Sequence, residues 1–266
     1  MELFQAIILA ILQGITEFLP VSSSAHLILL PKLLGWVDQG LAFDVAVHVG
    51  TLLAVIIFLR AELIKIIPAW LKGWTSFAWN KDGQLGWLVV IATIPVGLAG
   101  LVLGDVIETS LRSATVIALA TFVFAVFLWW SDRGGADNKK TMTTLTWRSA
   151  LLVGVAQAFA LIPGTSRSGV TMTAMLALGY ERVTAAKFSF LLAVPTIVLS
   201  GLFKTAELVT SETAVAWDML AVGIIVSALI AFWAMHWFIS LVTRLGMTPF
   251  VIYRFILAIF IWIVLV

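Results

Sequence analysis

Cysteine is absent from this chain of 266 residues, and charged residues make up only 11% of it. The absence of cysteine excludes disulfides, thiolate metal sites, iron–sulfur clusters and cysteine nucleophiles. A soluble domain of this size is about one quarter charged, so the few charges here cannot cover a water-exposed surface. The net charge of +2 is also too small for a nucleic-acid-binding face.

What the chain does contain is apolar sequence, since 62% of its residues are hydrophobic. This composition predicts an all-α polytopic membrane protein that forms a single membrane domain over 1–266. Met1 to Leu12 is apolar but lacks a basic n-region, which predicts that no signal peptide is cleaved. Six stretches have the length and hydropathy of transmembrane helices: 42–59, 86–104, 115–130, 188–203, 219–238 and 249–266.

Two further apolar segments, 1–36 and 149–180, are interrupted in the middle by proline, glycine and hydroxyl residues. Each half is too short to cross about 30 Å of hydrocarbon. Irregular backbone at membrane depth is tolerated only where protein or a wet cavity covers it. We therefore expect both segments to be re-entrant helical hairpins, with turns at Leu19–Ser24 and Ile162–Gly169.

The distribution of Lys and Arg between loops predicts the orientation in the membrane. One set of loops holds eleven basic residues: Arg60, Lys65, Lys72, Lys81, Arg133, Lys139, Lys140, Arg148, Arg182, Lys187 and Arg244. The opposite set holds three: Lys32, Arg112 and Lys204. The richer set should be cytoplasmic, and the two hairpins then enter from opposite sides of the membrane.

Each predicted hairpin is followed by three spans, in opposite senses. This order predicts a three-plus-three inverted repeat, with a first repeat at 1–130, a cytoplasmic linker at 131–148 and a second repeat at 149–266. A weak similarity between 13–20 and 157–163 agrees with it, although the charge topology is its main support. Inverted repeats place their site near the midplane, where broken helices meet.

Glu17 and Arg167 are ionisable residues inside the two interrupted segments. Each costs at least about 2.5–3.5 kcal/mol at membrane depth, so each needs a partner, and one shared polar cavity would serve both. Gln13 lies one helical turn before Glu17, and the two offer oxygens to a hard cation such as Mg²⁺. The alternative is an ion pair that only holds the hairpins together, which would leave the surrounding hydroxyl clusters unexplained.

Ser22, Ser23 and Ser24 form a hydroxyl cluster that precedes His26. Ser23 and His26 are three residues apart and would face the same way on a helix, so His26 could activate the hydroxyl as a general base. The serines could instead be N-caps of the half-helix that begins there.

The second turn has the chemistry of a phosphate-binding loop. Arg167 offers a planar fork to an anion, and the N-terminus of the following helix favours negative charge. Hydroxyl donors surround it at Thr165, Ser166, Ser168 and Thr171, and Ser22 and Ser24 of the first turn are further candidate phosphate-binding residues. Among the other polar residues, His48 is interpreted as a packed or interfacial histidine, although it could line the cavity. Arg254 is expected to snorkel toward the cytoplasmic side.

Two segments resemble the signatures of a known family: Gln13-Gly-Ile-Thr-Glu17-Phe-Leu-Pro-Val-Ser22-Ser23-Ser24-Ala-His26 and Pro163-Gly-Thr-Ser-Arg167-Ser-Gly-Val-Thr171. They are similar to those of undecaprenyl-diphosphate phosphatases of the bacitracin-resistance type, and the resemblance extends over the whole chain. The first motif position, glutamate in many members, is Gln13 here, and Gln cannot supply charge. Ser24-Ala25 replaces the usual pair before the histidine.

The resemblance implies a multi-pass enzyme of the bacterial inner membrane, with a site open to the periplasm. It would remove the terminal phosphate of undecaprenyl diphosphate, a polyprenyl diphosphate lipid, and so recycle the carrier for peptidoglycan synthesis. Glu17, Ser23, His26 and Arg167 would be catalytic, and a divalent cation, Mg²⁺ or Ca²⁺, would rest on Glu17 and Gln13. Ser23 or a water molecule could attack. A homodimer is compatible with the sequence, and a lipid-phosphate transporter or flippase is the alternative function.

Overall fold

The computed structural model describes residues 1–76, 80–135, 137–210 and 216–266. Within these ranges the chain is helical, and its only β-type pairing is an isolated bridge between Lys140 and Tyr180. The helices run in the order α1 (Leu3–Thr16), α2 (Ser23–Leu34), α3 (Gly40–Phe58), α4 (Arg60–Ser76), α5 (Lys81–Ser110), α6 (Ala114–Asp132), α7 (Trp147–Ala158), α8 (Arg167–Ala177), α9 (Arg182–Thr210), α10 (Trp217–Leu245) and α11 (Thr248–Leu265). Single 3₁₀ turns occur at Met142–Thr144 and Phe159–Leu161.

Six described helices are long and apolar enough to cross a membrane, and they confirm the six predicted spans. They are Gly40–Phe58, Lys81–Gly104, Ala114–Asp132, Arg182–Ala206, Trp217–Leu245 and Thr248–Leu265. Bare apolar side chains such as Leu101, Leu202 and Ile263 lie on their outer faces. This outward exposure of large apolar residues suits lipid as the surrounding solvent. The chain is therefore a multi-pass helical membrane protein.

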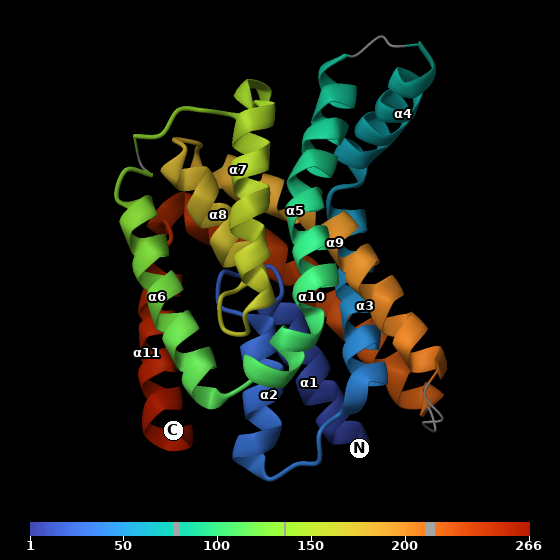
Figure 1. The fold of residues 1–266 in the computed structure, drawn as a ribbon, viewed down its shortest axis with the longest axis vertical. Coiled ribbons are helices and arrows are strands. Elements are labelled where there is room, and N and C mark those ends of the chain that lie inside the picture. Colours follow the sequence, from blue (N-terminus) through green and yellow to red (C-terminus); the bar gives the residue numbers. More distant parts are fainter. Residues whose placement is uncertain (77–79, 136, 211–215) are drawn as a thin grey trace.

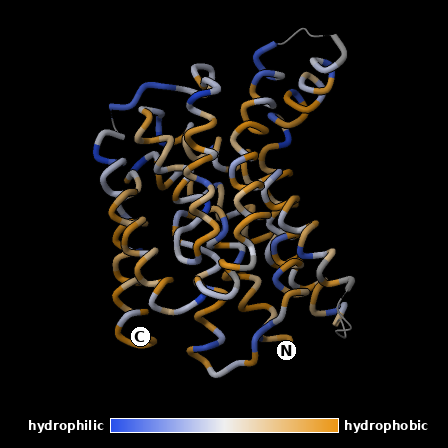
Figure 2. The backbone as a smooth tube through the Cα atoms, viewed as in Figure 1, coloured by the Kyte–Doolittle hydropathy of each residue, from blue (hydrophilic) through white to orange (hydrophobic). Residues whose placement is uncertain are grey.

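The two predicted helix breaks are also present. The first pair of short helices, α1 and α2, is joined by residues 17–22, and the second pair, α7 and α8, by residues 159–166. Figure 1 shows the two pairs entering the bundle from opposite ends, so that their loops meet near its centre. Figure 2 shows hydrophilic residues at the two ends and around this central meeting point.

Each short helix pair packs mainly on helices of the other half of the chain. Helix α1 packs on α10, while α7 packs on α5, and α6 packs on α11. Close approach depends on small residues at these crossings. At Gly154 of α7, a Cβ atom would lie 2.5 Å from the carbonyl oxygen of Ala92 on α5. Any larger residue at 154 would push the second helix pair away from α5.

Candidate active site

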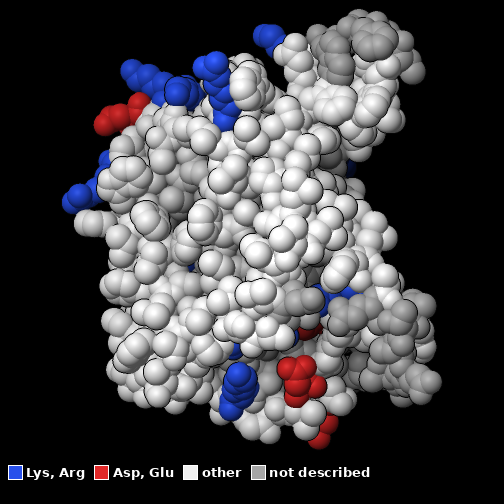
Figure 3. Space-filling model, viewed as in Figure 1, with Lys and Arg blue, Asp and Glu red and all other residues white. Residues whose placement is uncertain are grey.

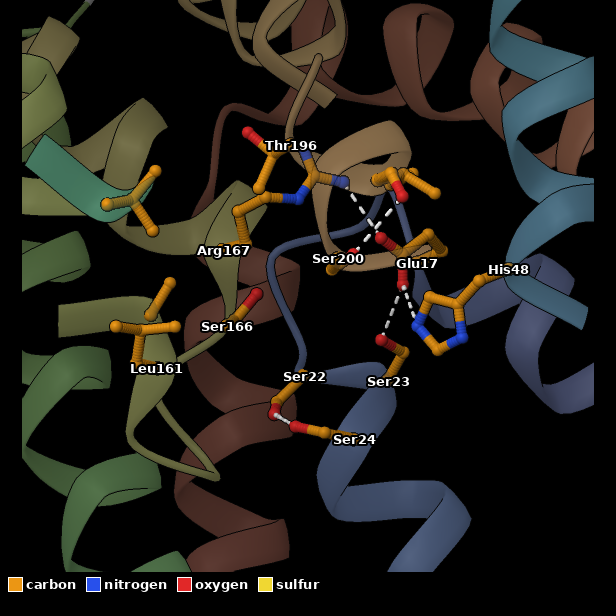
Figure 4. Close-up of a pocket in the computed structure, with 13 residues that line it drawn as sticks. Glu17, Ser22, Ser23, Ser24, His48, Leu161, Ser166, Arg167, Thr196 and Ser200 are labelled. Atoms are coloured by element: carbon orange, nitrogen blue, oxygen red, sulfur yellow. Dashed lines mark hydrogen bonds and ion pairs between the residues drawn. The ribbon is translucent and has the colours of Figure 1, made fainter. Parts of the chain in front are cut away.

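A polar cavity of about 200 Å³ lies where the two loops meet. Figure 4 shows side chains from both helix pairs pointing into it, together with His48 from α3 and Thr196 from α9. Its lining comprises Glu17, Ser22, Ser23, Ser24, His48, Val96, Ala160, Leu161, Ser166, Arg167, Thr196, Ile197 and Ser200. Polar groups come from both loops, from α3 and from α9, and apolar side chains come from α5, α9 and the start of the second loop.

Glu17 is the centre of the hydrogen bonding in this cavity. It directly follows α1 and is only 7% exposed. Its Oε1 accepts from Nη2 of Arg167 at 2.9 Å, and its Oε2 accepts from Oγ of Ser23 at 2.7 Å and from Nε2 of Gln13 at 3.0 Å. The prediction that Glu17 and Arg167 share one polar cavity is confirmed. The pair is more than a tie between helices, because it also orients a serine hydroxyl.

Two serines, one in each loop, have an unusual backbone conformation. Ser22 and Ser166 have φ angles of 74° and 71°, and they are the only non-glycine residues with positive φ in the described ranges. Each stands immediately before a helix, α2 or α8. Such a conformation costs of order 1–3 kcal/mol, and it persists where surrounding contacts enforce it, most often at functional sites. Both strained serines line the cavity.

Arg167 is the first residue of α8, and its guanidinium is held on two sides. Nη2 donates to Glu17, and Nη1 donates to the carbonyl oxygen of Ser189 at 3.2 Å. The backbone N–H of Gly169 donates to Oγ of Ser166 at 3.1 Å, which caps this helix. The positive end of a helix and a guanidinium fork thus face the same small volume, an arrangement that attracts phosphate.

Three of the predicted phosphate-binding residues lie outside the cavity. Oγ of Ser168 donates to the carbonyl oxygen of Leu19 at 2.7 Å, which ties the second loop to the first. Oγ1 of Thr171 donates to Oγ of Ser189 at 2.8 Å, and Thr165 is fully buried. Ser168 and Thr171 therefore bond other groups of the protein, and Oγ1 of Thr165 has no hydrogen-bond partner among the described residues. The contact of these three residues with phosphate stays a prediction. Ser22, Ser24, Ser166 and Arg167 remain in the lining.

The structure does not bring His26 to Ser23. Nδ1 of His26 lies 2.7 Å from the carbonyl oxygen of Ser22, and Nε2 lies 2.5 Å from the hydroxyl of Tyr253 on α11. Both ring nitrogens are thus occupied, and the hydroxyl of Ser23 points to Glu17 instead. The predicted pairing fails because Ser23 starts α2 and its side chain turns back across the loop, rather than along the helix face.

Residues from distant helices complete the cavity, and the sequence interpretation undervalued them. Nε2 of His48 lies 3.7 Å from Oε2 of Glu17, while its Nδ1 bonds the carbonyl oxygen of Asp44. His48 therefore lines the cavity, contrary to the packed or interfacial interpretation. Thr196 and Ser200 of α9 also line it. Their spacing of four residues within an apolar span was a signal that could have found them.

Arg254 does not snorkel, so that expectation is wrong. It is fully buried, and its guanidinium donates to backbone carbonyl groups of both loops and of α6. A residue near one end of a transmembrane helix normally reaches toward water. Here the carbonyl groups of the two loops lie within hydrogen-bond distance of the guanidinium inside the bundle.

The described part of the chain offers few side chains that could ligate a divalent cation. No group of three His, Cys, Asp or Glu side chains there could hold a metal ion. Gln13 turns its amide nitrogen, not its oxygen, toward Glu17, and Gln13 does not line the cavity. The carboxylate of Glu17 already accepts three hydrogen bonds. The residues present therefore do not form a preassembled cation site.

Together, the fold and the cavity define a polytopic helical membrane protein with a cavity among its helices that is lined by a guanidinium, a carboxylate and several hydroxyl groups. The chain belongs to the bacitracin resistance protein BacA family, whose model matches residues 6–260. It is 52% identical over 263 residues, 99% of both chains, to the undecaprenyl-diphosphatase of Teredinibacter turnerae. It is 51% identical to undecaprenyl-diphosphatase 1 of Pseudoalteromonas translucida, over 97% of both chains.

Proposed function

We propose that this protein hydrolyses undecaprenyl diphosphate to undecaprenyl phosphate and inorganic phosphate. The observation that carries the proposal is the joint contact of Glu17 with Arg167 and Ser23 inside one buried cavity. Full-length relatives at about half identity bear the name undecaprenyl-diphosphatase. The undecaprenyl phosphate that is formed would return to peptidoglycan synthesis as the carrier lipid.

The cavity offers different surroundings to the two ends of such a substrate. The terminal phosphate would lie against Arg167 and the hydroxyls of Ser22, Ser24 and Ser166. The first isoprenyl units would lie along the apolar wall of Val96, Leu161 and Ile197. This wall belongs to α5, α9 and the loop before α8, so the lipid tail would leave between helices into the bilayer.

Phosphoryl transfer depends mainly on positioning and on charge stabilisation. Ser23 would attack the terminal phosphorus in line, its proton would pass to Oε2 of Glu17, and the bond to the bridging oxygen would break to release undecaprenyl phosphate. Water would then hydrolyse the phosphoserine. In the competing route, a water molecule oriented by Glu17 attacks phosphorus directly. Arg167 would neutralise charge on the equatorial oxygens in either route.

The divalent cation stays a proposal. Because Glu17 is the one carboxylate in the lining, Mg²⁺ or Ca²⁺ would take most of its ligands from the diphosphate and from water. A bound cation would neutralise charge on the phosphates. Calorimetric titration of the chelated protein with a diphosphate, with and without Mg²⁺, measures this coupling without any turnover.

We also propose the finer architecture. The two helix pairs would be re-entrant hairpins, related by a three-plus-three inverted repeat, in the inner membrane. The reciprocal packing of α1 on α10 and of α7 on α5 supports the repeat. Figure 3 shows Lys and Arg gathered at the end from which α7 enters, and this end would be cytoplasmic by the positive-inside rule. The first pair would then enter from the periplasm.

Detergent-purified protein tests the proposal directly. It should release inorganic phosphate from undecaprenyl diphosphate in a single aqueous compartment. A transporter or flippase needs two compartments and releases none, so the absence of phosphate release from folded protein would overturn the proposal. The curated names of the relatives describe a phosphatase and do not favour the transporter.

A further inference from the structure

Arg254 of α11 is a fully buried group that contacts both loops of the site and belongs to neither helix pair. Nη1 donates to the carbonyl oxygen of Pro20 at 3.2 Å, and Nη2 donates to that of Gly164 at 3.0 Å. Pro20 stands two residues before Ser22, and Gly164 stands two residues before Ser166. One planar guanidinium therefore holds equivalent carbonyl groups ahead of both strained serines.

The surroundings of Arg254 make this contact rigid. The same guanidinium reaches the carbonyl oxygen of Thr121 on α6, at 3.2 Å from Nη2 and 3.4 Å from Nε. The hydroxyl of Thr121 in turn donates to the carbonyl oxygen of Gly164 at 3.3 Å. Gly164 has a φ of 94°, and a Cβ atom there would lie 2.5 Å from the carbonyl oxygen of Ile117. The second loop is thus fixed against α6 and tied by Arg254 to the first.

The burial of the Arg254 charge lowers the stability of the fold unless other interactions compensate it. It is fully buried, and no carboxylate within the described ranges forms an ion pair with it. Burial of a charge without an opposite charge is strongly unfavourable unless hydrogen bonds compensate it. Lysine could not replace the fork, since only the guanidinium presents several N–H groups in one rigid plane.

We propose that Arg254 is a positioning residue that sets the register of the two loops, so that Ser23 and Arg167 face the same phosphate. The proposal deepens the proposed function and rests on it for its kinetic part. The register itself is a structural quantity, which can be measured without substrate.

The experiment compares Arg254→Lys and Arg254→Met with the unaltered full-length protein in detergent. Arg254→Lys keeps the charge but loses the fork, and misplacement of reacting groups by about 1 Å costs about 100-fold in rate. We expect kcat to fall by about this factor in Arg254→Lys, with a far smaller change in KM, and to fall further in Arg254→Met. Guanidinium ion at non-denaturing concentration should restore part of the kcat of Arg254→Met, whereas methylammonium should not.

Hydrogen–deuterium exchange measured by mass spectrometry tests the register directly. In both variants exchange should rise in residues 17–24 and 162–169, with α3 and α10 unchanged. Ser227→Ala is the matched control, because Ser227 is fully buried and donates to the carbonyl oxygen of Val47, far along the chain from either loop. Its exchange should rise at α3 and α10, with residues 17–24 and 162–169 unchanged.

Three results would overturn the proposal: unchanged exchange in both loops, a rise spread over the whole chain, or full kcat in Arg254→Lys. If Arg254→Lys and Arg254→Met fail to fold, Arg254→Gln gives the same test, since its amide keeps a donor but cannot reach the carbonyl groups of Pro20 and Gly164 together. If the unaltered protein releases no phosphate, the proposed function fails, while the exchange result still decides the register.

Discussion

The loop after α1 and the loop before α8 both end at a serine with positive φ, Ser22 or Ser166, that precedes a helix. Each has a fully buried glutamine nine residues earlier, Gln13 or Gln157, and a carbonyl group held by Arg254 two residues earlier. The backbone conformation before the second helix is therefore similar in both helix pairs.

Where equivalent positions of both loops line the cavity, their side chains differ at two of them. Five residues before the serine stands Glu17 in the first loop and Leu161 in the second, and directly after the serine stands Ser23 or Arg167. The first loop thus brings a carboxylate and a hydroxyl, and the second brings a guanidinium and an apolar wall. Neither loop alone carries the set that phosphoryl transfer needs, so the reaction would depend on their meeting.

The largest effect on activity is expected from removal of the ion pair that joins the two loops. We expect Glu17→Ala and Arg167→Ala each to lower kcat/KM for undecaprenyl diphosphate by at least about 10³-fold, because each removes electrostatic stabilisation in a water-poor site. The double variant should lose less than the sum of the two effects, since the partners act together. Phosphate release measures this, with Leu161→Met as the control at the position equivalent to Glu17. Near-normal turnover in either single variant would contradict the assignment.

The next comparison is between Ser23 and its neighbour Ser22. Ser23→Ala should lower kcat by about 10³-fold if Ser23 is the nucleophile. Ser22→Ala should have a much smaller effect, because the hydroxyl of Ser22 contacts Ser24 and not Glu17. Acid quenching and mass spectrometry should trap phosphate on Ser23. Substantial turnover in Ser23→Ala would assign the attack to water.

A smaller effect is expected at His26, which has no counterpart in the second pair. His26→Asn keeps a donor near the carbonyl oxygen of Ser22 but has no basic nitrogen. We expect kcat to fall by about tenfold, less than the roughly 10²–10⁴-fold that loss of a general base typically costs, because His26 does not contact Ser23. Tyr253→Phe should have a similar effect. A loss of 10³-fold, with a changed pH profile of kcat, would restore His26 as the base.

The smallest expected effect concerns stability. Ser166 accepts a capping hydrogen bond from Gly169, but Ser22 has no side-chain cap. Alanine at either position meets the same unfavourable φ, so Ser166→Ala should lower the free energy of unfolding by about 1 kcal/mol more than Ser22→Ala does. Unfolding in mixed micelles, followed by circular dichroism, measures the difference. Equal losses would show that the cap contributes nothing at Ser166.

The sequence alone predicted what depends on composition and local pattern. The six spans follow from length and hydropathy, and the contact of Glu17 with Arg167 follows from the cost of charge at membrane depth. Local spacing was misleading at Ser23 and His26: both residues lie in α2, but the Ser23 hydroxyl donates to Glu17 across the loop and the His26 ring nitrogens contact Ser22 and Tyr253. The burial of Arg254 was not predictable, since it depends on two loops far away in the chain.

The hydrogen bonds of Glu17 have a consequence for how the site meets anions. The carboxylate of Glu17 accepts a hydrogen bond from the guanidinium of Arg167. It would therefore compete with any anion that binds to this guanidinium. An incoming anion would have to displace this carboxylate, and a monovalent anion such as chloride would offer Arg167 no more charge than the carboxylate does. A diphosphate would offer more charge and more oxygens, and the carboxylate would return to Arg167 after the product leaves. The ion pair would thus act as a selectivity filter and also limit product inhibition.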